Sequence, residues 1–404
     1  MSGSSPIFYG WRIVAAVCLI TTITSGLIFY NLSVLLNAFV AERGFPVSLT
    51  SAATAVCFIS GGVSGLLVGR LVDRFDPRAT IVASALLGSI CLLSVGYLYE
   101  TWQLFLFNIL FGFSYGGTGL VPLTTLITRW FNAKRSLALS IASTGLSLGG
   151  ILITPVVALS IERGGLSSVG PWMAVVFLLG IIPVTLLVMR PSPASMGLEP
   201  DGAAKPSAAE AERSANPAGY AEARRSGFFY AVSIAYLFLF GAQVAAIAHL
   251  YRLANVRDST ETAALALAFL AFASIAGRLS GGWIVLWIRV RSFALQLMAV
   301  QGAALMVLAF ANHRAAILAA VVLFGVTIGN SLMMHPLLLA EKFGTREYGR
   351  IYSISQFITM AGVAGGPLLI GIGYDWSGSY EIPFVVASLV TFVGFFVLLF
   401  GVKR

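Results

Sequence analysis

Arg278 is the one charged side chain that the sequence places deep inside an expected membrane span, near the middle of the apolar stretch 262–288. A cation in hydrocarbon is costly unless it faces a cavity or a partner, so such a residue usually marks the path of a substrate or an ion. Arginine binds a carboxylate through two parallel hydrogen bonds and stays charged at any working pH. Since the expected spans bring no carboxylate to this depth, the sequence predicts that the anion arrives as substrate.

The depth of Arg278 keeps its charge away from the membrane surface. It lies eleven residues from Arg289, about 16 Å along a helix, which is farther than the side chain reaches. We therefore expect a carboxylate-binding guanidinium that faces a central cavity. The alternative is a structural arginine, hydrogen-bonded to carbonyl groups of neighbouring helices.

Other side chains of the apolar segments are candidates for the same site. Tyr115 and Asn108 lie seven residues apart and hence on one helical face, where Tyr115 could donate a hydrogen bond to a carboxylate or hydroxyl. Hydrogen bonding between helices is the competing interpretation. Four further polar candidates lie in the expected spans one, ten and eleven: Tyr30, Asn31, Asn330 and Gln356. Two apolar residues, Leu27 and Phe357, could form walls that limit the size of the substrate.

Two histidines lie in expected spans. His249 closes span seven, and because histidine titrates near physiological pH it could take up a coupling proton; a hydrogen-bonded residue at the membrane interface is the alternative. His335 precedes Pro336, which frees backbone carbonyls. We expect His335 to satisfy one of those carbonyls rather than to carry function.

The composition is that of a polytopic membrane protein: 58% of the residues are hydrophobic and only 10% are charged. The first apolar run extends to about Leu36, too long for a signal-peptide core, and we expect it to be retained as a span. The three cysteines, Cys18, Cys57 and Cys91, lie in apolar segments without metal-ligand spacing and are expected to pack. Neither a metal nor a cofactor is expected.

Twelve windows of about 20 apolar residues are long enough to cross a bilayer. They form two sets of six, separated by residues 191–226, which are rich in Ala, Pro, Ser and Glu. The sequence therefore predicts an all-α membrane protein with an N-terminal half (1–190), a cytoplasmic linker (191–226) and a C-terminal half (227–404). Any helix in the linker is expected within Ala208–Arg225. The windows lie near 11–36, 49–69, 79–98, 102–127, 136–160, 172–189, 228–250, 262–288, 292–311, 315–339, 349–373 and 381–401.

The distribution of positive charge predicts the orientation. With the N-terminus inside, 19 of the 25 Lys and Arg residues fall in cytoplasmic segments and five in outer loops, and Arg278 is the remaining one. This asymmetry places both termini and the linker in the cytoplasm. It also accounts for the net charge of +9 without a nucleic-acid partner. The expected partners are the lipid bilayer, a small carboxylate substrate and a proton. A monomer is expected to be sufficient for transport.

The two halves echo one another in their glycines. The second span ends in Gly69–Arg78, and the eighth ends in Gly282 with Leu286 four residues later. Glycine and proline let helices approach and bend, and their repetition suggests a rocking transporter with its site between the halves. The other repeated motifs lie in spans five and eleven: Gly145-x-x-x-Gly149 and Gly362-x-x-x-Gly366-Pro367-x-x-x-Gly371.

Asp73 lies at the cytoplasmic end of span two, where a structural role is expected. Its carboxylate can accept hydrogen bonds from the start of span eleven, near Gly349–Tyr352, because a helix N-terminus favours an anion. Such a contact would brace the cytoplasmic side while the outer side is open. Arg74 and Arg78 would add charge pairs or serve as positive-inside anchors.

Taken together, these motifs resemble the major facilitator superfamily, and within it the branch of monocarboxylate transporters and oxalate/formate antiporters. The run Gly69–Arg78 is similar to the superfamily's loop signature between spans two and three, with Asp76-Pro77 in place of the usual glycine region. The resemblance implies the major facilitator fold of twelve helices in two pseudo-symmetric halves. Its branch-level motifs are Tyr9-Gly10-Trp11, Arg129-Trp130-Phe131 with Lys134-Arg135, Gly277-Arg278, Phe343-Gly344 and Gly366-Pro367-x-x-x-Gly371-x-x-x-Asp375-x-x-Gly378-x-Tyr380.

The resemblance also implies a carboxylate-binding role for Arg278, and two departures from the pattern narrow the substrate. Monocarboxylate transporters have an aspartate four residues before this arginine, where this chain has Ser274. The exchanger relatives have a lysine in span eleven, and this chain has no lysine between Arg350 and Lys403. One cation matches one carboxylate, whereas a dianion would leave a charge uncompensated at low dielectric.

The expected function is therefore proton-coupled symport of a small monocarboxylate, such as L-lactate or pyruvate, across the plasma membrane. Carboxylate antiport and a non-transporting receptor on the same fold are the alternatives. Export of hydrophobic cations is a further rival, but such pumps usually need carboxylates within the membrane. An enzyme is not expected, because the sequence shows no nucleophile–base pair, phosphate loop or metal cluster.

Overall fold

The computed structural model describes residues 8–201 and 219–401, and within these ranges the chain is helical apart from one isolated parallel β-bridge between Phe131 and Asp201. Eleven helices of the described chain are long and apolar enough to cross a membrane. One of them, Arg135–Leu187, has 53 residues and is broken at Gly165, whose φ of 70° and ψ of 173° are not helical. It therefore supplies two spans, and the prediction of an all-α membrane protein with twelve spans is confirmed.

The described chain packs as two compact units. Unit 1 holds residues 8–201 together with Gly344–Ser353, and unit 2 holds residues 219–343 and 354–401. The units follow the two predicted halves except at the eleventh span, whose first turns belong to unit 1. Part of the predicted linker lies outside the described residues; the described part consists of residues 191–201 in unit 1 and 219–226 in unit 2.

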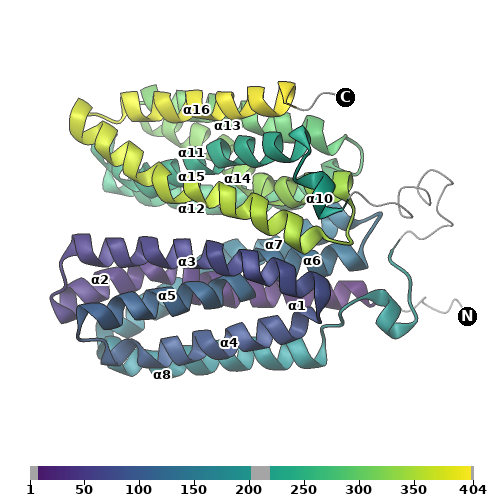
Figure 1. Cartoon of the computed structure of the whole chain (residues 1–404). Helices are drawn as coiled ribbons and strands as arrows, with labels where there is room; N and C mark the ends of the chain where they lie inside the picture. Colours follow the sequence, from purple (N-terminus) through teal and green to yellow (C-terminus); the bar gives the residue numbers. More distant parts are fainter. Residues whose placement is uncertain (1–7, 202–218, 402–404) are drawn as a thin grey trace, which may run out of the picture. The chain divides into compact units, whose positions relative to one another are not determined.

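In unit 1, α3 packs on α5, α1 on α7 and α4 on α8, and Figure 1 shows α4 and α8 side by side. The first and fifth spans each contain a π-helical turn, η1 and η3, and these two turns contact each other. The elements are α1 (Gly10–Thr24), η1 (Ser25–Phe29), α2 (Asn31–Arg43), α3 (Val47–Arg74), α4 (Pro77–Ser94), η2 (Val95–Tyr97), α5 (Thr101–Thr118), α6 (Leu120–Trp130), α7 (Arg135–Leu148), η3 (Gly149–Ile153), α8 (Thr154–Leu187) and η4 (Pro193–Met196).

In unit 2, α12 packs on α14, and α16 packs on both α11 and α13. Figure 1 shows α13 and α16 side by side. A cluster of small and aliphatic side chains from these helices forms the core of the unit. The elements are α10 (Tyr220–Ala223), α11 (Gly227–Arg257), α12 (Thr260–Ile284), α13 (Val290–Phe310), α14 (Arg314–Phe343), α15 (Tyr348–Ser377) and α16 (Glu381–Phe400).

The same helix packing occurs in both units, in the same register. Four glycines bring one helix so close to its partner that an added Cβ would meet a carbonyl oxygen, and the pairs in the two units differ by a constant 213 residues. Small residues at this spacing allow such close approach. Gly112 faces Cys57 and Gly116 faces Gly61 in unit 1, and Gly325 faces Leu270 and Gly329 faces Ser274 in unit 2. The structure thus shows an internal duplication in which Arg278 corresponds to Gly65.

The glycine motifs of the fifth and eleventh spans also bring helices together. A Cβ at Gly149 would meet the oxygen of Thr22 in the first span, and a Cβ at Gly362 would meet the oxygen of Leu237 in the seventh. In both units the glycine motif therefore faces the first helix of its own half.

The motifs around Tyr9 and Trp130 have a structural explanation. The Tyr9 hydroxyl donates to the carbonyl of Val188 at 2.8 Å, and Trp130 Nε1 donates to the carbonyl of Arg190 at 3.0 Å. The Asp201 carboxylate accepts from two backbone N–H groups in the loop before α7. Residues 188–201 are thereby packed on unit 1, although the sequence assigned most of them to a flexible linker.

Two arginines that the sequence assigns to outer loops cap the ends of neighbouring helices. A terminal nitrogen of Arg43 donates to the carbonyl of Gly96 at 2.6 Å. Arg257 donates at the same distance of 2.6 Å to the carbonyl of Ala309, which lies 213 residues after Gly96. Arg257 further bonds the carbonyls of Leu308 and Ala311. Carbonyls at a helix C-terminus lack partners within the helix and favour a nearby cation.

We predict that Arg257→Ala destabilises the protein by about 1–2 kcal/mol, because three helix-terminal carbonyls lose a charged donor. A thermal-shift measurement in detergent should show a fall in Tm of a few degrees. Arg163→Ala is the control, since Arg163 is exposed, and its Tm should match that of the wild type. Equal values of Tm for all three proteins would contradict the capping role.

Candidate functional site

Arg278 lies in unit 2, on α12, with only 1% of its surface exposed. Its Nε donates to the carbonyl of Gly329 on α14 at 3.0 Å. The missing side chain of Gly329 makes this approach possible, because a Cβ there would lie 3.0 Å from the Cβ of Arg278 and would overlap the oxygen of Ser274. The carbonyl contact that the sequence offered as the structural alternative is therefore present, and it uses the Nε–H of the guanidinium.

A buried hydroxyl lies one turn from this contact. Ser274, one turn before Arg278, is buried, and its hydroxyl has no hydrogen-bond partner among the described residues. The hydroxyl of Ser331, two residues beyond Gly329 on α14, is also buried without a partner in the described chain. Buried polar groups of this kind are costly unless a ligand or water satisfies them. The turn before Arg278 thus offers a hydroxyl group where the resemblance implied a carboxylate.

Asn330 joins the two helices of the site. Its Nδ2 donates to the carbonyl of Gly277 on α12 at 2.8 Å and to that of Val326 on its own helix at 2.9 Å. Both amide hydrogens are thus used, while Oδ1 points at the bare α-carbon of Gly281. Asn330 therefore holds α12 against α14 beside Arg278 and has no donor left for a substrate.

His249 lies in a different part of unit 2, among α11, α15 and the start of α16. Its Nε2 is 3.1 Å from the carbonyl of Pro367, and its Nδ1 is 3.4 Å from the Tyr380 hydroxyl. A carbonyl only accepts, so Nε2 carries the hydrogen, and in the neutral ring Nδ1 accepts from Tyr380. Burial raises the pKa of Tyr380, which keeps that hydroxyl protonated. His249 thereby holds α11 to the proline of α15.

The remaining candidates of unit 2 lie on α15. Phe357 is 39% exposed, as expected of a wall or a lipid-facing residue. The Oε1 of Gln356 is buried and has no partner within the described chain. Gly366 lets the backbone of α15 approach α11, since a Cβ there would overlap the oxygen of Gly241.

In unit 1, Tyr30 and Tyr115 are brought together through Phe29. The Phe29 ring lies 5.0 Å from Tyr30, edge to face, and 6.3 Å from Tyr115, stacked. Leu27 and Asn31 are fully buried instead, and Asn31 donates to the carbonyl of Leu27 at 3.1 Å and contacts a methionine of α8. The π-helical turn η1 ends at Phe29, so a uniform α-helical wheel misplaces these neighbours.

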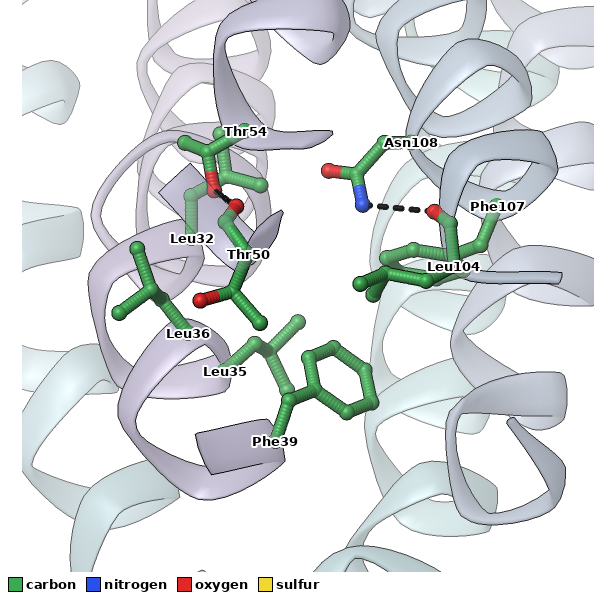
Figure 2. Close-up of a pocket in the computed structure, with 9 residues that line it drawn as sticks. All are labelled: Leu32, Leu35, Leu36, Phe39, Thr50, Thr54, Leu104, Phe107 and Asn108. Atoms are coloured by element: carbon green, nitrogen blue, oxygen red, sulfur yellow. Dashed lines mark hydrogen bonds between the residues drawn. The ribbon is translucent and has the colours of Figure 1, made fainter. Parts of the chain in front are cut away.

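Asn108 lines a small cavity of about 10 Å³ in unit 1, and Tyr115 is not among the lining residues. Figure 2 shows its amide above Phe107, with Nδ2 donating to the carbonyl of Leu104 at 2.9 Å. Leucine, phenylalanine and two threonines make up the rest of the lining. A cavity of this size holds about one water molecule, so it is too small for a carboxylic acid.

Asp73 makes the contact expected of it. Its two oxygens accept from the backbone N–H groups of Gly349, at 3.0 Å, and Arg350, at 2.7 Å, which begin α15 and belong to unit 1. Gly69 allows the approach, because a Cβ there would overlap the oxygen of Gly349. The contact is observed, and its role in transport stays a prediction.

The two arginines of the loop signature differ in their surroundings. Arg78 forms an ion pair with Asp76 at 2.6 Å. Burial alone would raise the pKa of Asp76, but the hydrogen bonds from Arg78 outweigh it and lower that pKa. Arg74 is exposed, as an anchoring residue would be. Arg129, which sequence reasoning did not connect to this loop, donates to the carbonyl of Val72 at 2.8 Å.

A buried histidine network is the feature of unit 2 that sequence reasoning missed. His335 Nε2 is 2.7 Å from the Ser355 hydroxyl, and that hydroxyl is 2.8 Å from Ser233 on α11. The partner of Nε2 is thus a serine on α15 and not the backbone carbonyl that Pro336 was expected to free. The polar serines at 233 and 355 within apolar spans were the available signal.

Comparisons with known proteins agree with this architecture. The family model of the Major Facilitator Superfamily matches residues 18–359, and the chain belongs to this superfamily of membrane transporters. An MFS-type transporter of Gibberella moniliformis is 26% identical over 334 residues, covering 79% of this chain and 74% of that protein. The uncharacterised MFS-type transporter YcxA of Bacillus subtilis is 24% identical over 372 residues, covering 89% and 85%.

Two solved structures share the fold at low sequence identity. The E. coli fucose:proton symporter FucP superposes with a TM-score of 0.71 at 16% identity, over 97% of this chain and 98% of that one. The human organic anion transporter MFSD10 superposes with a TM-score of 0.70 at 14% identity, over 98% and 100%. At this level of identity the likeness shows the fold of the chain and not its substrate.

We predict that Gly329→Ala disturbs the site, because the added methyl overlaps the Ser274 oxygen and crowds Arg278. Overpacking of this kind costs about 1–3 kcal/mol, and the Tm should fall by several degrees. The matched control is Gly365→Ala, where a Cβ meets open space and the helix should be unaffected or slightly stabilised. If Gly329→Ala is as stable as Gly365→Ala, the close packing at Arg278 is not required.

Proposed function

We propose that this protein is a proton-coupled symporter of small monocarboxylates, such as L-lactate or pyruvate, and that Arg278 binds the carboxylate. The observation that carries the proposal is the buried guanidinium of Arg278, held in place by the carbonyl of Gly329 at 3.0 Å. A guanidinium oriented in this way presents its terminal N–H groups in a planar fork, which matches a carboxylate.

The surroundings of Arg278 favour a substrate with a single negative charge. Ser274 supplies a neutral hydroxyl, where an aspartate would compete with the substrate for the guanidinium. On α15 the sequence holds no lysine between Arg350 and the chain's last residues, so no second cation comes from that helix to balance a dianion. A second carboxylate would then have to be desolvated without compensation.

The buried hydroxyl of Ser274 supports a small polar acid over a purely hydrophobic ligand. Ser274 lies one turn before Arg278, and its hydroxyl has no partner among the described residues, so a carboxylate or hydroxyl of a substrate bound at Arg278 would satisfy it. MFSD10 is described as an organic anion transporter and FucP as a proton symporter. Transport of an organic anion and coupling to a proton therefore both occur on this fold, as carboxylate symport requires.

The orientation and the cycle follow from the same reasoning. We place both termini in the cytoplasm and the protein in the plasma membrane, on the distribution of positive charge. The hydrogen bonds of Asp73 to Gly349 and Arg350 then hold the start of α15 at the cytoplasmic end of α3. Alternating access requires such contacts to break and re-form. The coupling proton rides on a titratable side chain, for which His249 is the sequence-based candidate, or on the substrate.

Arg278→Gln and Arg278→Lys should both abolish L-lactate uptake driven by a pH gradient in proteoliposomes. Removing one partner of a buried, hydrogen-bonded charge pair costs about 2–5 kcal/mol, so uptake should fall by at least about 30-fold. The lysine variant keeps the charge and loses the fork. Because a ligand stabilises the folded protein by mass action, the rise in Tm with L-lactate should disappear in both variants.

The exposed Arg163→Gln is the control for these variants and should transport as the wild type does. The Tm of each variant without ligand separates a lost site from a lost fold. Uptake that persists in a folded Arg278→Gln protein would sink the proposed role of this residue.

The choice of substrate and the mode of coupling are tested on the wild-type protein. L-lactate and pyruvate should raise the Tm, whereas oxalate should raise it little, because the site compensates one charge. Lactate accumulation should require a pH gradient. Strong stabilisation by oxalate, or accumulation driven only by a carboxylate on the other side at equal pH, would favour the antiport alternative.

A further inference from the structure

His335 is a buried titratable side chain that the transport scheme above leaves without a role. It lies in α14 directly before Pro336 and has none of its surface exposed. Its ring connects three helices, because Nε2 contacts Ser355 of α15 at 2.7 Å and Ser355 contacts Ser233 of α11 at 2.8 Å. All of these residues belong to unit 2.

The direction of this hydrogen-bond chain follows from its last member. The Ser233 hydroxyl lies 2.8 Å from the carbonyl of Phe229, and a carbonyl only accepts. If Ser233 donates there, Ser355 donates to Ser233, and Ser355 in turn accepts from His335 Nε2–H. This direction makes all three bonds at once, whereas the reverse direction gives up the bond to Phe229. The neutral ring thus carries its hydrogen on Nε2, and Nδ1 is the position that an added proton takes.

The aromatic neighbours of the ring suit a positive charge. Tyr236 of α11 stacks on His335 with 4.7 Å between the ring centres and 18° between the planes, and Phe240 meets it edge-on at 5.9 Å. The face of an aromatic ring attracts a cation most where water is excluded. An imidazolium at this position therefore has a stabilising partner that an isolated buried histidine lacks.

Three helices of unit 2 bring the groups that bear on the charge of His335. Tyr236 faces it from α11, and α15 brings the Ser355 hydroxyl. On α12 the charge is Arg278, which contacts α14 at Gly329. Gly329 and His335 are six residues apart, about 9 Å along the helix.

Like charge couples substrate and proton. The guanidinium of Arg278 and an imidazolium at His335 are both positive and repel one another, and a carboxylate bound to Arg278 relieves that repulsion. The relief raises the proton affinity of His335, and by linkage the proton raises the affinity for the carboxylate by the same factor. Mutual stabilisation of this kind is what a symporter requires.

We propose that His335 carries the coupling proton, with Ser355 and Ser233 orienting its ring. The proposal rests on the proposed function, since it assigns the proton of that same transport cycle. The proton binds at Nδ1 when the carboxylate occupies Arg278, and it leaves after the carboxylate is released. No covalent bond other than this N–H bond forms or breaks.

The decisive variant is His335→Gln, which keeps a side-chain N–H for Ser355 and cannot titrate. In proteoliposomes it should retain L-lactate counterflow at equal pH within about twofold of the wild type. Accumulation driven by a pH gradient, and the proton entry that accompanies it, should fall at least tenfold. The KM for counterflow should lose its dependence on pH.

Two further variants provide a control and a second test. His313→Gln is the matched control, because His313 is exposed at the start of α14, and it should keep counterflow, accumulation and proton entry. Ser355→Ala keeps His335 and removes its hydrogen-bond partner. It should shift the pH midpoint of lactate accumulation without abolishing proton entry, which also provides a test if His335→Gln does not fold.

Three outcomes would overturn the assignment: unchanged proton entry with lactate in a folded His335→Gln protein, loss of its counterflow together with its accumulation, or an unshifted pH midpoint in Ser355→Ala. Loss of coupling in His249→Gln, with coupling kept in His335→Gln, would move the proton to His249. Absence of lactate counterflow in the wild type would instead refute the proposed function, which keeps the two failures distinguishable.

Discussion

The hydrogen bond from Arg278 Nε to the carbonyl of Gly329 is the interaction on which the organisation of unit 2 depends. It requires α12 and α14 to touch through their backbones, and this contact is possible only because position 329 has no side chain. The bond orients a cation that hydrocarbon would otherwise reject. Asn330 reinforces the same contact by donating to Gly277. A buried cation is thus kept in place by the packing of α12 on α14.

The two units share their packing and differ in their chemistry. The glycine contacts of α3 with α5 recur between α12 and α14. Arg43 caps its neighbouring helix at Gly96, and Arg257 caps its own neighbour at Ala309, 213 residues after Gly96. The position that corresponds to Arg278 in unit 1 is Gly65. Among the described residues, the shared scaffold therefore carries a fully buried arginine at this position in unit 2 and a glycine in unit 1.

Buried polar contacts divide into those that hold helices together and those that leave atoms available. Asn330 donates both amide hydrogens to nearby carbonyls, and Asn31 donates to the carbonyl of Leu27 and contacts the sulfur of Met173. Polar groups in hydrocarbon must find such partners when water is absent. Ser274 keeps a hydroxyl without a partner among the described residues. His335 is intermediate, because it is bonded through Nε2 and stacked on Tyr236 and still has a second nitrogen that can bind a proton.

Hydrophobic run length and charge were enough to determine the twelve spans, the duplication and the depth of Arg278, because a bilayer imposes the same length and the same cost of charge on every helix. Local spacing was also sufficient for Asp73, whose partner is a helix terminus. The tertiary structure alone decided which polar residues share a neighbourhood. It placed Asn108 at a cavity that Tyr115 does not line, and it connected His335 to Ser355. Such contacts depend on which helix packs against which, and the spacing along one span does not encode that.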